Sequence, residues 1–284
     1  MKPDHGFRRI SLTLVWFWLL VFAMVPLVLV TIASFLSHNN GQLVSLPFTL
    51  QNYAALGSRV YIRILQQSFY IAGGCTLICL LLGYPFAWLV ARMQMRARSL
   101  MILLIIIPFW TSSLIRSYSM ITLLKPGGVI NSLLMWTGLI SKPLPLLFSD
   151  TAVMTGLVYN LLPFMVLPLL TNIERLDDQL IDAARDLGAN RLTTFRKVIL
   201  PLTLPGILSG CILVFLPAMT LFYIPDLLGG SKSILLGNLI QNQFLVAQNW
   251  PLGSAVSMVF TLMLIVLLVI YWRAIRHDVR RELA

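Results

Sequence analysis

The sequence predicts an all-α integral membrane protein with six transmembrane helices. Of its 284 residues, 58% are hydrophobic and only 11% are charged, and its mean hydropathy is +0.86. Soluble domains carry roughly 25% charged residues. Six apolar segments are each long enough to cross a bilayer, and the polar intervals between them alternate between basic and non-basic composition. We therefore expect a single transmembrane domain over residues 1–284, with no separate soluble domain.

The six apolar segments define the expected spans. Crossing the hydrocarbon core takes about 20 residues in a helix. The first segment is too long for a signal-peptide core and lacks a small-residue cleavage site, so we expect it to be retained. The third ends where Lys125-Pro126-Gly127-Gly128 interrupts the helical pattern. The expected spans are 12–36, 66–91, 100–124, 151–173, 199–224 and 252–272.

The distribution of basic residues predicts the orientation of the chain. Most of the 21 Lys and Arg residues fall in four intervals: Lys2 to Arg9, 92–98, 174–197 and Arg273 to Arg281. Cytoplasmic loops carry such an excess. We expect these intervals and both termini to be cytoplasmic, and the external segments to be 37–65, 125–149 and 225–250. The net charge of +11 does not indicate a nucleic-acid partner, because the charges alternate with the spans.

The sequence shows no signs of catalysis. Cys75, Cys79 and Cys211 lie inside apolar runs, with no spacing typical of a metal site or a disulfide framework. The chain also lacks the glycine-rich Walker A loop that binds ATP phosphates. We expect no metal, no cofactor and no enzymatic activity, and any ATP hydrolysis would belong to a separate partner.

Residues 174–197 form the polar interval around which we interpret the chain. The loop holds half of the ten acidic residues. Asp177 and Asp178 are suited to the start of a helix, where free N–H groups favour carboxylates. Gly188 is suited to its end, and Asn190 or Thr193 can cap the next helix. The apolar residues of the predicted helix at helical spacing are Leu176, Leu180, Ala183, Ala184 and Leu187.

The spacing within this loop resembles a family motif. Asp182-Ala183-Ala184, Gly188 and Leu200-Pro201 resemble the EAA loop of ABC importer permeases, with Asp182 in place of Glu and Val198 in place of Ile. The alternative is a solvated connector. The resemblance implies a type I importer fold in which residues 174–197, the coupling loop, carry a coupling helix docked on an ATPase. The residues implied in that contact are Asp182, Ala183, Ala184, Arg185, Asp186 and Gly188.

Prolines and one arginine mark the apolar segments. Six prolines interrupt the spans, and each frees the carbonyl four residues earlier. Together they indicate that the third, fourth and fifth spans surround a pathway. Arg116 lies in the outer half of the third span, and an ionisable residue there is a functional candidate. The alternative is that Arg116 extends outward to the headgroups, and the sequence leaves both open.

The segment from Pro108 to Tyr118 carries a second, narrower resemblance. It is similar to the Pro-Phe-Trp-Thr-x-x-Leu-Ile-Arg-x-Tyr stretch of spermidine/putrescine importer permeases, as is Leu216-Pro217-Ala218-Met219 with its following residues. The resemblance covers about residues 10–275 and is nearest to the B-type permease subunit of such systems. It implies that the substrate is a polyamine and that the protein lies in the bacterial inner membrane. The implied partners are a homologous second permease, an ATPase dimer and a periplasmic binding protein.

A path for a chain of ammonium groups needs carboxylates, free carbonyls and aromatic faces. We expect Phe215, Met219, Phe222 and Asp226 to share one helical face. The blander alternative is aromatic packing, with Asp226 as a cap at the end of a span. The candidate pathway residues are Trp110, Tyr118, Tyr159, Phe222, Tyr223 and Asp226.

Two other functions are compatible with parts of the sequence. The first is an importer of the same class for iron or an opine-like compound. The second is a self-contained secondary transporter, which needs ionisable residues near the bilayer midplane. The sequence has none deeper than Arg116 and no inverted repeat.

Overall fold

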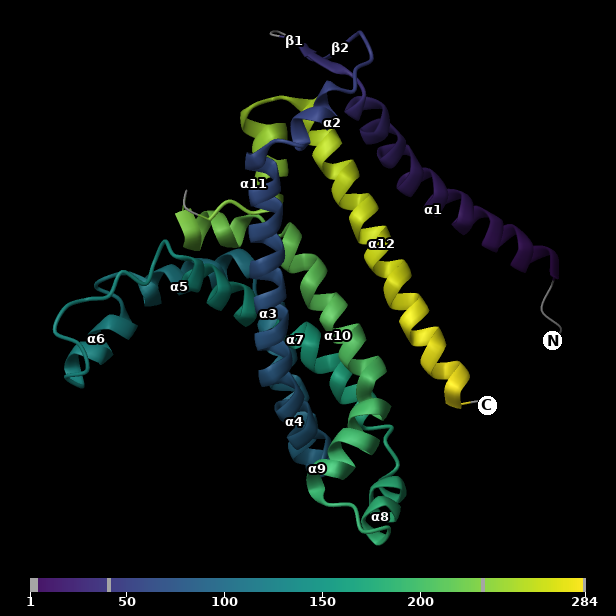
Figure 1. Ribbon diagram of the computed structural model, residues 1–284, viewed down its shortest axis with the longest axis vertical. Helices are drawn as coiled ribbons and strands as arrows, with labels where there is room; N and C mark the ends of the chain where they lie inside the picture. The colour runs from purple at the N-terminus through teal and green to yellow at the C-terminus, as the bar shows by residue number, and fades with distance from the viewer. Residues whose placement is uncertain (1–4, 40–41, 231–232, 283–284) are drawn as a thin grey trace. The chain divides into compact units, whose positions relative to one another are not determined.

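The computed structural model describes residues 5–39, 42–230 and 233–282, and most of these residues are helical (Figure 1). Lys2, one of the basic residues expected in the cytoplasm, lies outside the described residues. The chain forms two compact units. One contains the described residues up to Ile62 together with Leu239–Val269, and the other contains Arg63–Asn238 and the residues from Ile270.

The first unit is held together where its first helix ends. It contains α1 (His5–Ser34), the hairpin β1 (Ser37–Asn39) and β2 (Gln42–Ser45), α2 (Gln51–Leu56), η5 (Asn242–Val246) and α12 (Trp250–Glu282) up to Val269. The Asn52 Nδ2 donates to the Ser34 and Leu36 carbonyls, at 3.0 and 2.8 Å. This amide thereby ties α2 to the end of α1. The two-stranded hairpin has no counterpart in the sequence expectations.

The second unit is built around α7 (Asp150–Ile173), which packs along α10 (Leu200–Thr220) and beside α3 (Arg59–Ala91). Leu157, Met165 and Leu169 of α7 are fully buried. A Cβ atom at Gly210 of α10 would lie 2.6 Å from the Met165 Sδ, so the glycine permits close approach of the two helices. A helix buried on most sides needs apolar residues all around, as α7 has.

The third expected span, 100–124, does not form one straight helix. It contains α4 (Met95–Ile106), η1 (Ile107–Trp110) and α5 (Ser113–Leu124), and α6 (Val129–Trp136) follows. The segments before and after Thr111–Ser112 are bent by 93°. Pro108 lacks the N–H that would bond the Leu104 carbonyl, and Thr111 is extended with ψ of 145°. The break therefore falls just after the proline.

The fifth expected span, 199–224, ends early. The helix α10 stops at Thr220, and Leu221 is extended with ψ of 115°. A separate turn, η3 (Pro225–Gly229), follows, and then α11 (Leu236–Gln241). The expected face of Phe215, Met219, Phe222 and Asp226 is therefore wrong, since only the first two lie on α10. Met219 is fully buried, and the Phe215 ring packs 5.7 Å from the ring of Phe69.

The number of candidate spans agrees with the expected architecture. Five helices are long and apolar enough to cross a membrane, and the bent pair of the third segment raises the count to six if it is one span. The five are Leu12–Ser34, Arg59–Ala91, Asp150–Ile173, Arg191–Thr220 and Trp250–Arg273. The all-helical membrane architecture is the one that the sequence predicts.

The approach of α11 to the end of α10 leads to a stability prediction. A Cβ atom at Gly237 would lie 2.2 Å from the Thr220 carbonyl oxygen, so Gly237→Ala forces the backbones apart. We expect it to cost about 1–3 kcal/mol, the usual range for overpacking, and to lower the Tm measured in detergent. Gly73→Ala is the matched control, because nothing lies within 4 Å of a Cβ there. Equal Tm values for the two variants would contradict the close approach.

Candidate functional site

Local capping signals define the coupling loop, and the structure confirms each of them. The helix α8 (Asp178–Asp186) begins after Asp177, whose Oδ1 accepts a hydrogen bond from the Gln179 N–H at 2.9 Å. Gly188, with φ of +82°, adopts the left-handed conformation just past the helix end. Asn190 Oδ1 accepts from the Thr193 N–H at 2.8 Å and caps α9 (Arg191–Thr194), which η2 (Phe195–Ile199) joins to α10.

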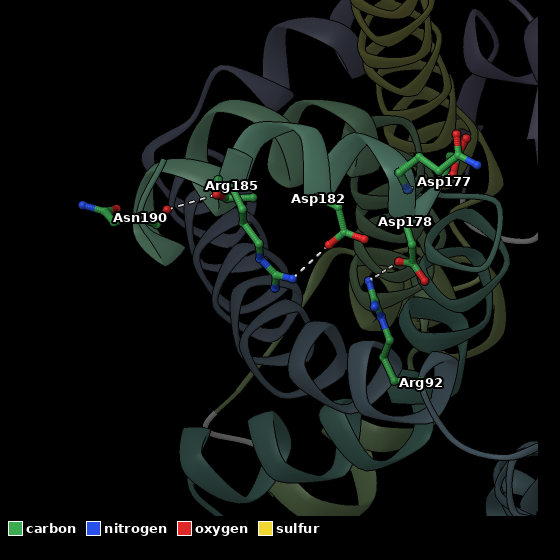
Figure 2. A network of polar contacts seen from close by, with 8 residues as sticks. Arg92, Asp177, Asp178, Asp182, Arg185 and Asn190 are labelled. Atoms are coloured by element: carbon green, nitrogen blue, oxygen red, sulfur yellow. Dashed lines mark hydrogen bonds and ion pairs between the residues drawn. The ribbon is translucent and has the colours of Figure 1, made fainter. Parts of the chain in front are cut away.

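The helix α8 has two unlike sides. The apolar residues expected at helical spacing stay largely uncovered by the chain, and Leu180 and Leu187 are 48% and 89% exposed. Ile181, which lies outside that stripe, is instead the buried residue of the helix at 4% exposure. At 100° per residue, Asp178, Asp182 and Arg185 lie opposite the stripe, and Figure 2 shows them on one side of α8. Within the described chain, the stripe is therefore free to contact a partner.

Ion pairs join the coupling loop to the turn after α3 and to the first turn of α4. Arg92 reaches Asp178 at 2.9 Å, and its guanidinium carbon lies 4.7 Å from the centre of the Trp88 ring (Figure 2). Arg98 pairs with Glu174, and both side chains are half-buried. The two pairs bring together the intervals 92–98 and 174–197, which the charge distribution places on the same side of the membrane. The exposed Arg92–Asp178 pair is worth roughly 0.2–1 kcal/mol, so it orients the loop more than it stabilises it.

The remaining predicted coupling residues lie on or near α8. Asp182 accepts from Arg185 at 3.1 Å, so these two charges partly satisfy each other. Ala183 and Asp186 are exposed, and Ala184 is half-buried. No other atom of the described chain lies within 4 Å of a Cβ built at Gly188. The glycine is therefore needed here for its left-handed backbone conformation and not for close packing within this chain.

Three of the predicted pathway residues meet at the corner after α10. The Phe222 and Tyr223 rings are 6.0 Å apart in an edge-to-face arrangement. Asn238 of α11 donates from Nδ2 to the Phe222 carbonyl at 2.7 Å and to the Asp226 carboxylate. Asp226 is exposed, so its second oxygen remains open to solvent or a ligand. The sequence-based expectation missed Asn238, although a single amide inside the apolar run 235–240 is a usable signal.

The other three predicted pathway residues do not join that corner. Tyr159 of α7 lies under Arg116 of α5, with the guanidinium carbon 5.8 Å from the ring centre. The Nε and Nη1 atoms of Arg116 are buried and have no hydrogen-bond partner among the described residues. Trp110 and Tyr118 are exposed, and in the described parts of the chain no ring contact links them to the other candidates. Arg116 therefore faces an aromatic ring rather than an acid.

The comparison with protein families identifies the chain. Residues 80–277 match the profile of the family described as the binding-protein-dependent transport system inner membrane component. The chain belongs to this family. It is therefore a multi-pass, non-catalytic permease subunit of the inner membrane, and its class works with a binding protein and an ATPase.

Named relatives extend the match over nearly the full length. The chain is 46% identical over 276 residues to the spermidine/putrescine transport system permease protein PotB of Salmonella typhimurium, covering 97% of this chain and 96% of that protein. It is 48% identical to the PotB protein of Escherichia coli, covering 91% and 94%. The inner membrane ABC transporter permease protein YdcU of Escherichia coli is 32% identical over 78% of this chain and 74% of its own length.

Solved structures support the fold independently. A chain of a bacterial ABC transporter involved in the import of the acidic polysaccharide alginate superposes with a TM-score of 0.73 at 19% identity. The superposition covers 97% of this chain and 96% of the other. The arrangement of the helices is thus that of an ABC importer permease.

The half-buried pair of Arg98 and Glu174 leads to a second prediction. Arg98→Glu places two carboxylates together, and we expect it to lower stability by about 1–2 kcal/mol, between surface and buried pairs. The exchange Arg98→Glu with Glu174→Arg restores the attraction, so its Tm in detergent should return toward that of the wild type. Arg96→Glu is the control for the same charge change at an exposed site. The losses of stability in Arg98→Glu alone and in Glu174→Arg alone are added for comparison. If the double variant loses as much stability as this sum, the pair contributes nothing.

Proposed function

We propose that the chain is a transmembrane permease subunit of an ATP-driven importer that carries spermidine and putrescine across the inner membrane. The near-full-length likeness to permeases named for these two polyamines supports the substrate class. The observation that carries the proposal is the corner after α10. There the Asp226 carboxylate, held by Asn238, lies in the same short segment as the paired rings of Phe222 and Tyr223.

The chemistry of this corner suits a flexible polycation. A carboxylate that is oriented by one amide and open on its other oxygen attracts an ammonium group without enclosing it. Aromatic faces attract the same groups weakly, which favours passage over trapping. Tyr159 adds a second aromatic face, which already lies under the Arg116 guanidinium. Pro163 also leaves the Tyr159 carbonyl without its helical donor. Trp110 and Tyr118 complete the proposed pathway as exposed aromatic residues on neighbouring segments.

The coupling loop supplies the proposed connection to the ATPase. The uncovered stripe of Leu180, Ala183, Ala184 and Leu187 offers an apolar contact, and Gly188 keeps the end of α8 narrow. Of the charges expected in this contact, Asp186 lies at its edge, where charges set the specificity of an interface more than its affinity. Asp182 and Arg185 lie on the opposite side of α8 and pair with each other there. ATP-driven movement of the partner would reach α7 and α10 directly, because the loop joins these two helices.

The proposed assembly contains this chain, a homologous second permease, two ATPase subunits and a periplasmic binding protein. The basic intervals support a cytoplasmic position for the coupling loop and both termini. The corner after α10 then faces the periplasmic side, where the binding protein delivers substrate.

Replacing the corner's carboxylate tests the substrate proposal. Asp226→Asn keeps the shape and still accepts the hydrogen bond from Asn238, but it removes the charge. We expect uptake by the full transporter to fall by about tenfold, and more for spermidine than for putrescine, because spermidine carries one more ammonium group. The assay measures uptake of both labelled polyamines at saturating binding protein, with expression and ATPase assembly checked.

Asp150→Asn is the matched control. Asp150 is the other acid on the outer side, and its carboxylate accepts from Ser233. We expect this variant to transport normally. Wild-type rates in Asp226→Asn across a range of spermidine concentrations would make Asp226 a structural residue. If iron or an opine-like compound competes for uptake and polyamines do not, the transporter has another substrate.

A further inference from the structure

A cavity lies between the end of α3 and the coupling loop, and none of the functions discussed above uses it. Its volume is about 650 Å³, and its walls come from the last two turns of α3, from α8 and from α9 with η2. The Tyr84 and Phe195 rings meet edge to face at 5.9 Å and form part of the wall. The Tyr84 hydroxyl is 3.1 Å from the Thr203 Oγ1, which fixes the ring.

Three guanidinium groups line this cavity, from Arg92, Arg185 and Arg191, and no acid is among its described lining residues. Arg92 and Arg185 each use one nitrogen on a carboxylate, of Asp178 and Asp182, whose side chains are both 67% exposed. Figure 2 shows both arginine side chains on the side of α8 that carries these acids. Arg191 has no ion-pair partner in the described part of the chain. The guanidinium groups retain N–H donors that an anion can use.

The rest of the cavity wall is apolar and continues onto an exposed apolar side of α3. Trp88, Leu89 and Ile181 line it, and Leu89 is 61% exposed. Leu81 and Leu82 continue the exposed apolar surface one to two turns earlier. Tryptophan and tyrosine concentrate at the level of the lipid headgroups, so Tyr84 and Trp88 place the cavity at the membrane boundary. A ligand that fits both the arginine-lined part and the apolar wall of the cavity has an anionic head and an apolar tail.

We propose that this cavity binds an anionic phospholipid from the leaflet that the coupling loop adjoins. The phosphate lies among Arg92, Arg185 and Arg191, and the first acyl carbons lie against Trp88 and Leu89. Basic pockets beside transmembrane helices are suited to such headgroups. Free phosphate satisfies the arginines alone and leaves the apolar wall empty, which is why a lipid is the better occupant.

The bound lipid has a mechanical consequence. A phosphate shared by Arg92, which directly follows α3, Arg185 of α8 and Arg191 of α9 bridges these three parts of the chain. It holds the coupling loop against α3 at the surface where Arg92 already meets Asp178. Bilayers poor in anionic lipid would then leave the loop less firmly placed.

Native mass spectrometry of the full-length chain, purified in a mild detergent with its co-purifying subunits, tests the site. The preparation is delipidated and then offered phosphatidylglycerol or phosphatidylcholine. We expect the wild type to retain phosphatidylglycerol, and Arg191→Gln to retain it about tenfold less, because one charge-assisted contact is lost. Arg196→Gln is the control, since Arg196 is exposed on η2 and does not line the cavity. Size-exclusion chromatography checks that the variants stay folded.

Each other outcome overturns the proposal. Equal retention by Arg191→Gln and the wild type would remove the arginines from the site. Equal retention of phosphatidylcholine would show that the charge is not recognised. Displacement of phosphatidylglycerol by excess inorganic phosphate would make this a free-phosphate site. A cavity filled by a co-purifying subunit would leave wild type and Arg191→Gln alike in lipid content.

Discussion

The polar coupling loop cannot enter the hydrocarbon of a bilayer, and this constraint orders the second unit of the chain. Charged residues at the bilayer centre are costly, so α7 and α10 must both end at one membrane surface. The same surface receives the turn after α3, where Arg92 and Arg98 meet Asp178 and Glu174. Gly210 permits the close packing of α7 on α10, and in the proposed mechanism this packing would carry a displacement of the loop into the membrane.

The backbone is irregular at two places within the apolar segments, and both lie beside candidate pathway residues. The third segment breaks at Thr111–Ser112, directly after Trp110, and α10 stops at Thr220, two residues before Phe222. Irregular backbone at membrane depth is tolerated where protein or a water-filled cavity receives its polar groups. Asn238 does this at the second break by donating to the Phe222 carbonyl. The same amide orients Asp226, so one residue links the end of the helix to the proposed cation site.

The sequence predicts best what depends on local chemistry. Asp177, Gly188 and Asn190 take their expected places, because caps and left-handed glycines act within one helical turn. The early end of α10 is harder to predict, because the Thr220–Gly237 approach at that end joins two segments that local sequence signals do not relate. The burial of Ile181 in place of the apolar stripe is likewise unpredictable from the sequence. Periodicity does not say whether an apolar stripe packs against its own chain or against another subunit.

Site-specific photocrosslinking along α8 tests most directly whether its exposed stripe is the docking surface for the ATPase. A photoreactive residue at position 187 lies on the stripe, and one at position 178 lies on the opposite side, where Asp178 meets Arg92. In membranes that contain the assembled transporter, we predict an ATPase adduct from position 187 and none from position 178. An adduct from position 178 with none from position 187 would contradict the account, because α8 would then dock through the side that this chain already occupies.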